Sequence, residues 1–224
     1  ACRLAHDVYP DDPRIAYQLG RALHAAKQYS EAIPLSRHAA DRGNRNAVTN
    51  LGVLYEGGIG DTKDHAEALR FFRQGSDLGS PISMTNLGKM YLNGEGVAKN
   101  AEEAARLFQM AASLENADAM TSLGNLYRYG TGVTKDPGAA MRLYRRAADL
   151  GDSFAMLFLG GMYQGGEGIA KDNVTAVAFY RRSADIGNVA AIVSLGGMYQ
   201  NGFGTAKDEA EAARAYCLRQ RFAD

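Results

Sequence analysis

Residues 159–172 read Leu-Gly-Gly-Met-Tyr-Gln-Gly-Gly-Glu-Gly-Ile-Ala-Lys-Asp, and this stretch is one of five related copies in the chain. In each copy a Tyr follows the first Leu at the fourth position. A constant step of 36 residues separates the Leu-Gly pairs, which are Leu51-Gly52, Leu87-Gly88, Leu123-Gly124, Leu159-Gly160 and Leu195-Gly196. A fixed period of this length predicts a solenoid of repeated supersecondary units.

Each repeat is predicted to form an antiparallel pair of helices. In the second full repeat, apolar residues recur at the spacing i, i+3, i+6 and i+7 of one buried helical stripe; they are Met84, Leu87, Met90 and Tyr91. We expect the Tyr of every repeat, Tyr163 included, to belong to the core. The Gly of each Leu-Gly pair falls inside this helix, where Gly costs about 1 kcal/mol relative to Ala. We therefore expect a neighbouring helix to pass too close for a Cβ atom.

The connection between the two helices carries glycines at two fixed positions, which suit a positive φ at a helix end. The pairs are Gly58/Gly60, Gly94/Gly96, Gly130/Gly132, Gly166/Gly168 and Gly202/Gly204. The second helix is predicted to begin after Asp64, Asn100, Asp136, Asp172 or Asp208, with capping boxes completed by Glu67, Glu103 and Glu211. Glu115 stands where most second helices end with Gly, which predicts strain or an altered turn there.

Composition excludes several classes of protein. The chain has 25 Lys and Arg against 25 Asp and Glu, so it lacks the basic excess of a nucleic-acid binder. It has no apolar run of about 18 residues, so no membrane insertion is expected. Cys2 and Cys217 give neither a disulfide framework nor metal-ligand spacing. The chain begins with Ala and lacks the order of a signal peptide, so we expect it to be part of a longer protein.

No catalytic, cofactor or metal site is predicted, and the chain is expected not to be an enzyme. A phosphate-binding Walker loop needs Gly-Lys-Ser/Thr at a helix start, whereas the Lys of each turn here precedes Asp or Asn. All four histidines lie in the first 65 residues without metal-ligand pairing, and no nucleophile has a base at suitable spacing. The paired arginines Arg145-Arg146 and Arg181-Arg182 are interpreted as solvated residues of the second helices.

The motif Leu-Gly-x-x-Tyr-x-x-Gly-x-Gly-x-x-Lys-Asp, followed by Ala-x-x-Phe/Tyr-Tyr/Phe-x-x-Ala-Ala-x-x-Gly, resembles the Sel1-like repeat, a relative of the tetratricopeptide repeat. The resemblance covers residues 44–224, with repeats expected at about 44–79, 80–115, 116–151, 152–187 and 188–224. Residues 1–43 are expected to hold a partial helix and one unit that resembles a tetratricopeptide repeat. The resemblance implies an all-α, right-handed superhelix of antiparallel helix pairs, continuous from end to end. It also implies a bacterial source, and the absence of Cys pairs leaves a cytoplasmic or a periplasmic location open.

The resemblance implies that the first helices line the concave face of such a superhelix. Removing the buried stripe leaves a candidate peptide-binding set: Arg21, Thr85, Lys89, Asn125, Arg128, Phe154, Leu157, Phe158, Gln164, Val193 and Gln200. The basic members are interpreted as sites that pair either with acidic groups or with a C-terminal carboxylate of a partner. The apolar members either form a shelf for a peptide or pack against neighbouring helices. The expected function is a non-enzymatic adaptor that binds a protein or peptide.

Two other functions stay open. The chain would alternatively be the regulatory or recognition region of a larger enzyme, such as a hydrolase or protease, whose catalytic domain lies outside it. A domain upstream in the full-length gene would favour that alternative. A third possibility is a spacer that self-associates through its terminal repeats, which concentration-dependent association would support.

Overall fold

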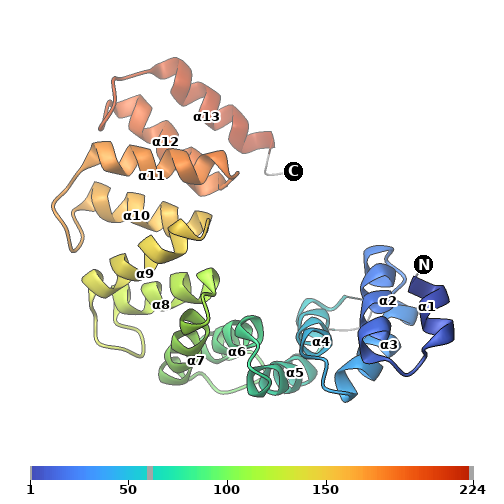
Figure 1. Ribbon diagram of the computed structural model, residues 1–224. Coiled ribbons are helices and arrows are strands. Elements are labelled where there is room, and N and C mark those ends of the chain that lie inside the picture. The colour runs from blue at the N-terminus through green and yellow to red at the C-terminus, as the bar shows by residue number, and fades with distance from the viewer. Residues whose placement is uncertain (1, 60–62, 222–224) are drawn as a thin grey trace. The chain divides into compact units, whose positions relative to one another are not determined.

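The computed structural model describes residues 2–59 and 63–221, with side chains as far as residue 217, and its regular structure is helical (Figure 1). These residues form thirteen α-helices and no strand, which confirms the all-α prediction. After α1 (Cys2–Val8), first and second helices of 13 residues alternate. The first helices are α2 (Pro13–Ala25), α4 (Arg45–Gly57), α6 (Pro81–Asn93), α8 (Ala117–Tyr129), α10 (Ser153–Gly165) and α12 (Val189–Asn201). The second helices are α3 (Tyr29–Asp41), α5 (His65–Asp77), α7 (Ala101–Ser113), α9 (Pro137–Asp149), α11 (Asn173–Asp185) and α13 (Glu209–Arg221).

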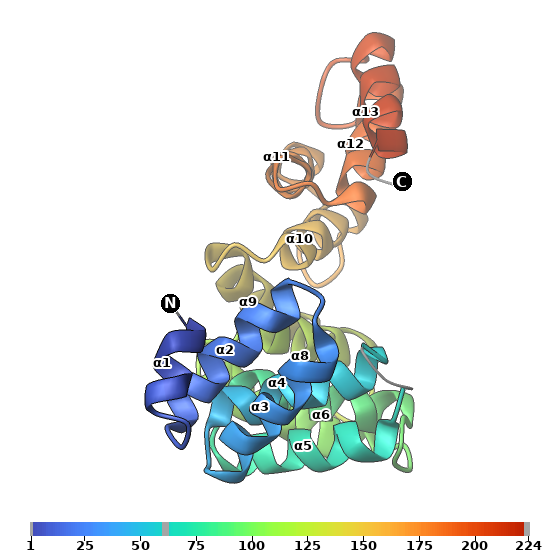
Figure 2. The same cartoon turned by 90° about the vertical axis from the view of Figure 1, so that its right-hand side faces the viewer.

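The chain divides into two compact units, residues 1–114 with α1 to α7 and residues 115–224 with α8 to α13. Within each unit every helix packs against the helices that precede and follow it. In the second unit, α12 and α13 lie side by side in both views (Figure 2). Each unit is therefore a stack of helix pairs, as expected of a solenoid.

No helix in the described residues has the length and the apolar character needed to cross a membrane.

The core of each unit lies between the first and second helices. In the first unit, Val48, Leu51 and Phe72 are fully buried at the centre of one apolar cluster. In the second unit, a cluster of buried side chains from α11 and α12 includes Tyr180 and Met198. Burial of these stripes removes apolar surface from water, which is the main stabilising contribution to such a fold.

The Gly of each Leu-Gly pair lies beneath an aromatic ring from the paired second helix. A Cβ atom built on Gly52 would lie 2.4 Å from Cε1 of Phe72, and one on Gly160 would lie 2.5 Å from Cε1 of Tyr180. Neither distance leaves room for an additional carbon atom. The predicted close approach is confirmed, and the group that approaches is a ring side chain.

The turns after α6, α10 and α12 contact the start of the second helix in the preceding repeat. Gly166 adopts φ 73° and caps α10, as predicted from the paired glycines. Gly168 (φ 71°) lies against the start of α9, because a Cβ there would be 2.7 Å from Cβ of Pro137. Gly204 meets Asn173 at the start of α11 in the same way. Of the predicted turn glycines, Gly60 lies outside the described residues.

The second helices are capped as predicted, but the predicted capping boxes do not form. The Asp64 side chain accepts hydrogen bonds from the backbone N–H groups of Ala66 and Glu67, at 2.9 and 3.0 Å. The N–H of Asp64 itself donates to the carbonyl of Tyr55, at 3.0 Å. Because that donor is already used, Glu67 instead pairs with Arg70, at 3.0 Å. In the same way, Glu103 pairs with Arg106 and Glu211 with Arg214.

Arginines of the second helices bind the Tyr of the following repeat, which corrects their interpretation as merely solvated. Arg145 donates to the hydroxyl of Tyr163 at 2.7 Å, and Arg181 donates to that of Tyr199 at 2.5 Å. Arg146 pairs with Glu115. These side chains stay largely exposed, so each contact contributes little stability but connects adjacent repeats.

The turn before α8 contains the strain predicted from its sequence. Glu115 adopts φ 61°, where the corresponding Gly79 and Gly151 adopt φ 75° and 89°. A side chain in this left-handed region costs roughly 1–2 kcal/mol.

Replacing Glu115 with Gly is therefore expected to raise the free energy of unfolding by about 0.5–1 kcal/mol, after allowance for the greater freedom of Gly in the unfolded chain. Urea denaturation measures the change. Gly151→Ala is the matched control, because nothing lies within 4 Å of a Cβ there and only its φ opposes the substitution. A Glu115→Gly protein less stable than the parent would contradict this account of the turn.

Candidate functional site

The first helices expose one stripe of side chains, called here the first-helix face. In α4 it runs through Asn46, Asn50 and Val53, at the spacing i, i+4 and i+7. The corresponding residues of the later repeats are Ile82, Asn86 and Lys89, then Asp118, Ser122 and Asn125, then Phe154, Phe158 and Gly161, then Ala190, Ser194 and Gly197. The face is described separately for each unit.

Thr85 does not belong to this face, because only 2% of it is exposed. Its hydroxyl donates to the carbonyl of Pro81, at 2.7 Å. Thr49, at the same repeat position, is buried against Ser80 and Ser83, with oxygen–oxygen distances of 2.9 and 2.8 Å. This repeat position faces the interface with the next repeat. The exposed stripe predicted from the sequence is therefore one residue out of phase at Thr85.

Leu157 and Val193 share that repeat position and are half-buried. Leu157 packs against the cluster that contains Tyr180 and Met198. The sequence alone leaves open whether the apolar residues of the candidate set form a shelf for a peptide or pack against neighbouring helices. For Leu157 the contacts show packing.

Arg128 is already paired within the chain. Its Nε and one terminal nitrogen donate to the same Glu167 oxygen, at 2.8 and 2.6 Å, and both side chains are mostly buried. The hydrogen bond to Glu167 raises the pKa of the Arg128 guanidinium. Arg128 therefore joins α8 to the turn after α10 and is not an uncommitted cation for an acidic partner.

Tyr144 is buried beneath the first-helix face of the second unit, where it contacts Asn125 and Phe158. Its hydroxyl donates to Oδ1 of Asn125 at 2.7 Å, and burial raises its pKa. The ring of Phe158 lies 5.4 Å from that of Tyr144, tilted by 44°. Phe158 is thus half-buried by packing, whereas 56% of Phe154 is exposed. Of the predicted shelf, Phe154 is the residue most available to a partner.

Gln164 and Gln200 are each held by a Tyr of the paired second helix. The hydroxyl of Tyr180 donates to Oε1 of Gln164 at 2.7 Å, and that of Tyr216 donates to Oε1 of Gln200 at 3.1 Å. Burial raises the pKa of Tyr180 as it does that of Tyr144. These hydrogen bonds fix both amides at the edge of the face.

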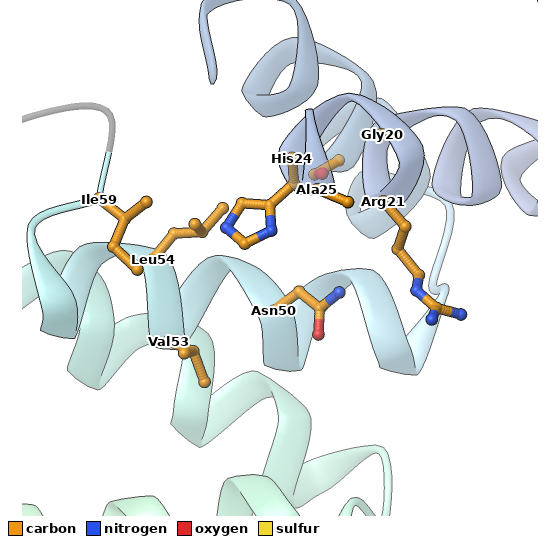
Figure 3. Close-up of a pocket in the computed structure, with 9 residues that line it drawn as sticks. Gly20, Arg21, His24, Ala25, Asn50, Val53, Leu54 and Ile59 are labelled. Carbon is orange, nitrogen blue, oxygen red and sulfur yellow. The ribbon is translucent and has the colours of Figure 1, made fainter. Parts of the chain in front are cut away.

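In the first unit, Arg21 is exposed on α2 and Lys89 is half-exposed on α6. Burial raises the pKa of Glu56, a neighbouring carboxyl of α4; Glu95 adds to this increase and Lys89 opposes it. Arg21 lies at the edge of a pocket of about 300 Å³ between α2 and α4, shown in Figure 3. Sequence reasoning missed this pocket. The residue that could have indicated the pocket is Ser36, because it is small and stands where the later repeats have Phe or Tyr.

Neither a metal centre nor a disulfide is found in the part of the chain that the structure describes. No cluster of three or more His, Cys, Asp or Glu side chains there could hold an ion. Cys2 and Cys217 are both exposed and unbonded.

Comparison with known proteins identifies the family. Residues 46–80, 81–116, 117–152, 153–188 and 189–219 match the Sel1 repeat. The chain is a Sel1 repeat protein. The predicted resemblance is thereby confirmed, and repeats of this family generally serve as scaffolds for protein interaction. No curated protein matches the chain.

Solved structures share the fold. A Sel1 repeat protein from Oxalobacter formigenes is 34% identical, with a TM-score of 0.87, over 93% of this chain and 85% of that one. The protective antigen c5321 of uropathogenic Escherichia coli, which has an SLR fold, is 27% identical with a TM-score of 0.85. The match covers 99% of this chain but only 48% of c5321, so the chain spans about half of that protein. The immunity protein Pa5087 of Pseudomonas aeruginosa is 26% identical, with a TM-score of 0.65 and 94% and 81% coverage.

Proposed function

We propose that this Sel1 repeat protein is a non-enzymatic scaffold that binds a protein or peptide on its first-helix face. The observation that supports the proposal most is the exposure of large apolar side chains there. Ile82 and Phe154 occupy the same repeat position at the start of a first helix, and 53% and 56% of them is exposed. Val53, further along α4, is 40% exposed. Apolar side chains amid polar ones are the usual anchors of a protein interface.

The surroundings of these anchors are held in place before any partner arrives. In the second unit, Asn125, Arg128 and Gln164 each have a hydrogen-bond partner within the chain. Side chains that are already ordered lose little conformational entropy on binding. The proposed mechanism is therefore recognition by a preorganised surface.

Phe154→Asp is expected to weaken binding of the native partner at least about tenfold, because a charge replaces an apolar anchor. The partner is first identified by co-purification from the native host with the parent chain, and its affinity for each variant is then measured. Ile82→Asp tests the first unit in the same way.

Val174→Asp is the matched control, because 67% of Val174 is exposed but it belongs to the second helix α11. Circular dichroism should be unchanged in all three variants. Partner binding that survives both Phe154→Asp and Ile82→Asp would argue against the first-helix face. Leu157 and Arg128 are unsuitable for this test, because changing either disturbs packing or an internal ion pair.

A second candidate role is that of an immunity protein. The resemblance to Pa5087 over 94% of this chain favours it. This role also requires binding to another protein, so the same surface variants apply. Protection of cells against a co-expressed toxin from the same genomic neighbourhood would support it, and absence of protection would leave only the general scaffold.

A further inference from the structure

The first helix pair lacks a ring that the other pairs have. Ser36 lies on α3 at the position that holds an aromatic residue in every later repeat, namely Phe72, Phe108, Tyr144, Tyr180 and Tyr216. In those repeats the ring covers the Gly of the first helix. At Gly20, the side-chain atom nearest to a built Cβ is Oγ of Ser36, at 3.0 Å.

A pocket opens beside the missing ring. Its volume is about 300 Å³, within the range of sites that hold small ligands or side chains. Gly20 and Ser36 both line it, and its apolar wall comes from Val53, Leu54 and Ile59. Figure 3 shows the His24 imidazole extending from α2 towards α4, with Asn50 on α4 and Arg21 at one side; all three residues line the pocket.

His24 lacks the hydrogen-bond partner that two of its counterparts, Gln164 and Gln200, have. It follows Gly20 by four residues, as Gln164 follows Gly160 and Gln200 follows Gly196. Both glutamines bind the hydroxyl of a Tyr from their own second helix. The Nε2 atom of His24 is buried and has no hydrogen-bond partner among the described residues. Ser36 does not replace the Tyr, because its hydroxyl donates to the carbonyl of Ala32, at 2.9 Å. A buried polar atom without a partner is uncommon and costly.

We propose that this pocket binds a tyrosine side chain of the partner protein, which supplies the ring that Ser36 does not. The ring lies against Gly20 and the wall formed by Val53 and Leu54, and the phenol hydroxyl hydrogen-bonds to Nε2 of His24. The repeats of the second unit provide the template, since Tyr180 contacts Gly160 and Gln164 in this way. Tyr is also a frequent anchor of protein interfaces, because it combines a large apolar ring with a polar end.

Arg21 indicates what flanks that tyrosine. It is exposed, lines the pocket and forms no ion pair within the described residues. Its guanidinium lies 5.8 Å from the ring of Tyr17, a contact that leaves the charge available. An acidic residue next to the bound tyrosine would therefore be favoured. This inference rests on the proposed function and specifies the side chain that the first unit recognises.

Titration of the isotope-labelled chain with N-acetyl-tyrosinamide tests the inference by two-dimensional amide NMR. Chemical-shift changes are expected at Gly20, His24 and Asn50. N-acetyl-phenylalaninamide should bind about three- to tenfold more weakly, since it lacks the hydroxyl that hydrogen-bonds to His24. The capped dipeptide Glu-Tyr should bind more tightly than Lys-Tyr. Shifts that are absent up to the solubility limit, or that fall outside the pocket, would overturn the inference.

Ser36→Tyr fills the pocket with the chain's own ring and is expected to abolish binding of N-acetyl-tyrosinamide. Ser36→Ala leaves the pocket open and should retain binding. His24→Leu, which does not depend on fitting a new ring, should bind the Tyr and Phe probes equally. Unchanged binding by Ser36→Tyr, or an unchanged preference for Tyr in His24→Leu, would contradict the proposal. If Phe154→Asp loses the native partner but Ser36→Tyr keeps it, the pocket inference fails alone. If Phe154→Asp, Ile82→Asp and Ser36→Tyr all keep it, the proposed function fails as well.

Discussion

Replacing Tyr144 with Ala is expected to lower the free energy of unfolding by about 3–5 kcal/mol, the range for truncating a large buried aromatic side chain. The ring is fully buried beneath the first-helix face. It covers Gly124, where a built Cβ would lie 2.6 Å from its Cε1 atom. The substitution also leaves Asn125 without its hydrogen bond. Urea denaturation measures the effect as a fall in midpoint at constant m value.

Tyr163→Ala is the informative comparison. The Tyr of every repeat was predicted to be core, but only Tyr55 is buried, whereas Tyr91, Tyr127, Tyr163 and Tyr199 are half-buried. The ring of Tyr163 stacks on that of Phe179, with centroids 5.8 Å apart, and its hydroxyl accepts from Arg145. Truncation should therefore cost less, about 1–3 kcal/mol. Equal losses for Tyr163 and Tyr144, or a loss below about 1 kcal/mol for Tyr144, would contradict this assignment of the core.

Gly160→Ala is expected to destabilise the second unit by about 1–3 kcal/mol, although Ala is the better helix former. The added methyl group would lie 2.5 Å from Cε1 of Tyr180. That ring has little room to move, because it is buried and its hydroxyl is bonded to Gln164. The overpacking should outweigh the gain of about 1 kcal/mol in helix propensity.

Gly161→Ala isolates the propensity effect one residue away. The nearest atom to its built Cβ is the Tyr180 hydroxyl at 3.7 Å, an ordinary contact. Gly197→Ala, with nothing within 4 Å, repeats the comparison in α12. Both variants should be more stable than the parent by about 0.5–1 kcal/mol, as judged by thermal and urea midpoints. A stabilised Gly160→Ala protein would show that the ring does not restrict that position.

The helix pairs were predictable because the apolar spacing and the turn glycines repeat with one period. Glu115 was identified as an anomaly from its place in that period, and its backbone φ bears this out. The capping boxes were not predictable in the same way. Glu67 can complete a capping box only if the backbone N–H of Asp64 is free to donate to it. That N–H donates to the carbonyl of Tyr55 instead. That contact joins two segments whose distance the sequence does not give.

The candidate site was less predictable than the fold, because exposure on a helix depends on phase and on the next repeat. Thr85 is buried by a seam that an isolated helix does not have. From the sequence, Arg128 resembles an unpaired cation. The structure shows that the turn after α10 brings Glu167 beside it to form an ion pair. Phe154 is apolar and lies on a first helix, but its exposure depends on how the neighbouring helices pack, which the sequence alone does not give. The pocket beside Gly20 could have been predicted only from Ser36, which stands at a repeat position that is aromatic in all later repeats.

The junctions between successive repeats share one register. The hydroxyl contact of Thr49 with Ser80 and the hydrogen bond of Thr121 to Asp152 both span 31 residues, and Gly168 meets Pro137 across the same interval. Within a unit, modules of 36 residues can thus be duplicated or deleted without changing the spacing of these contacts, so that the scaffold changes length in fixed increments. A single inserted residue between two such partners would break the register, which restricts how a protein of this kind can be lengthened during evolution or by design.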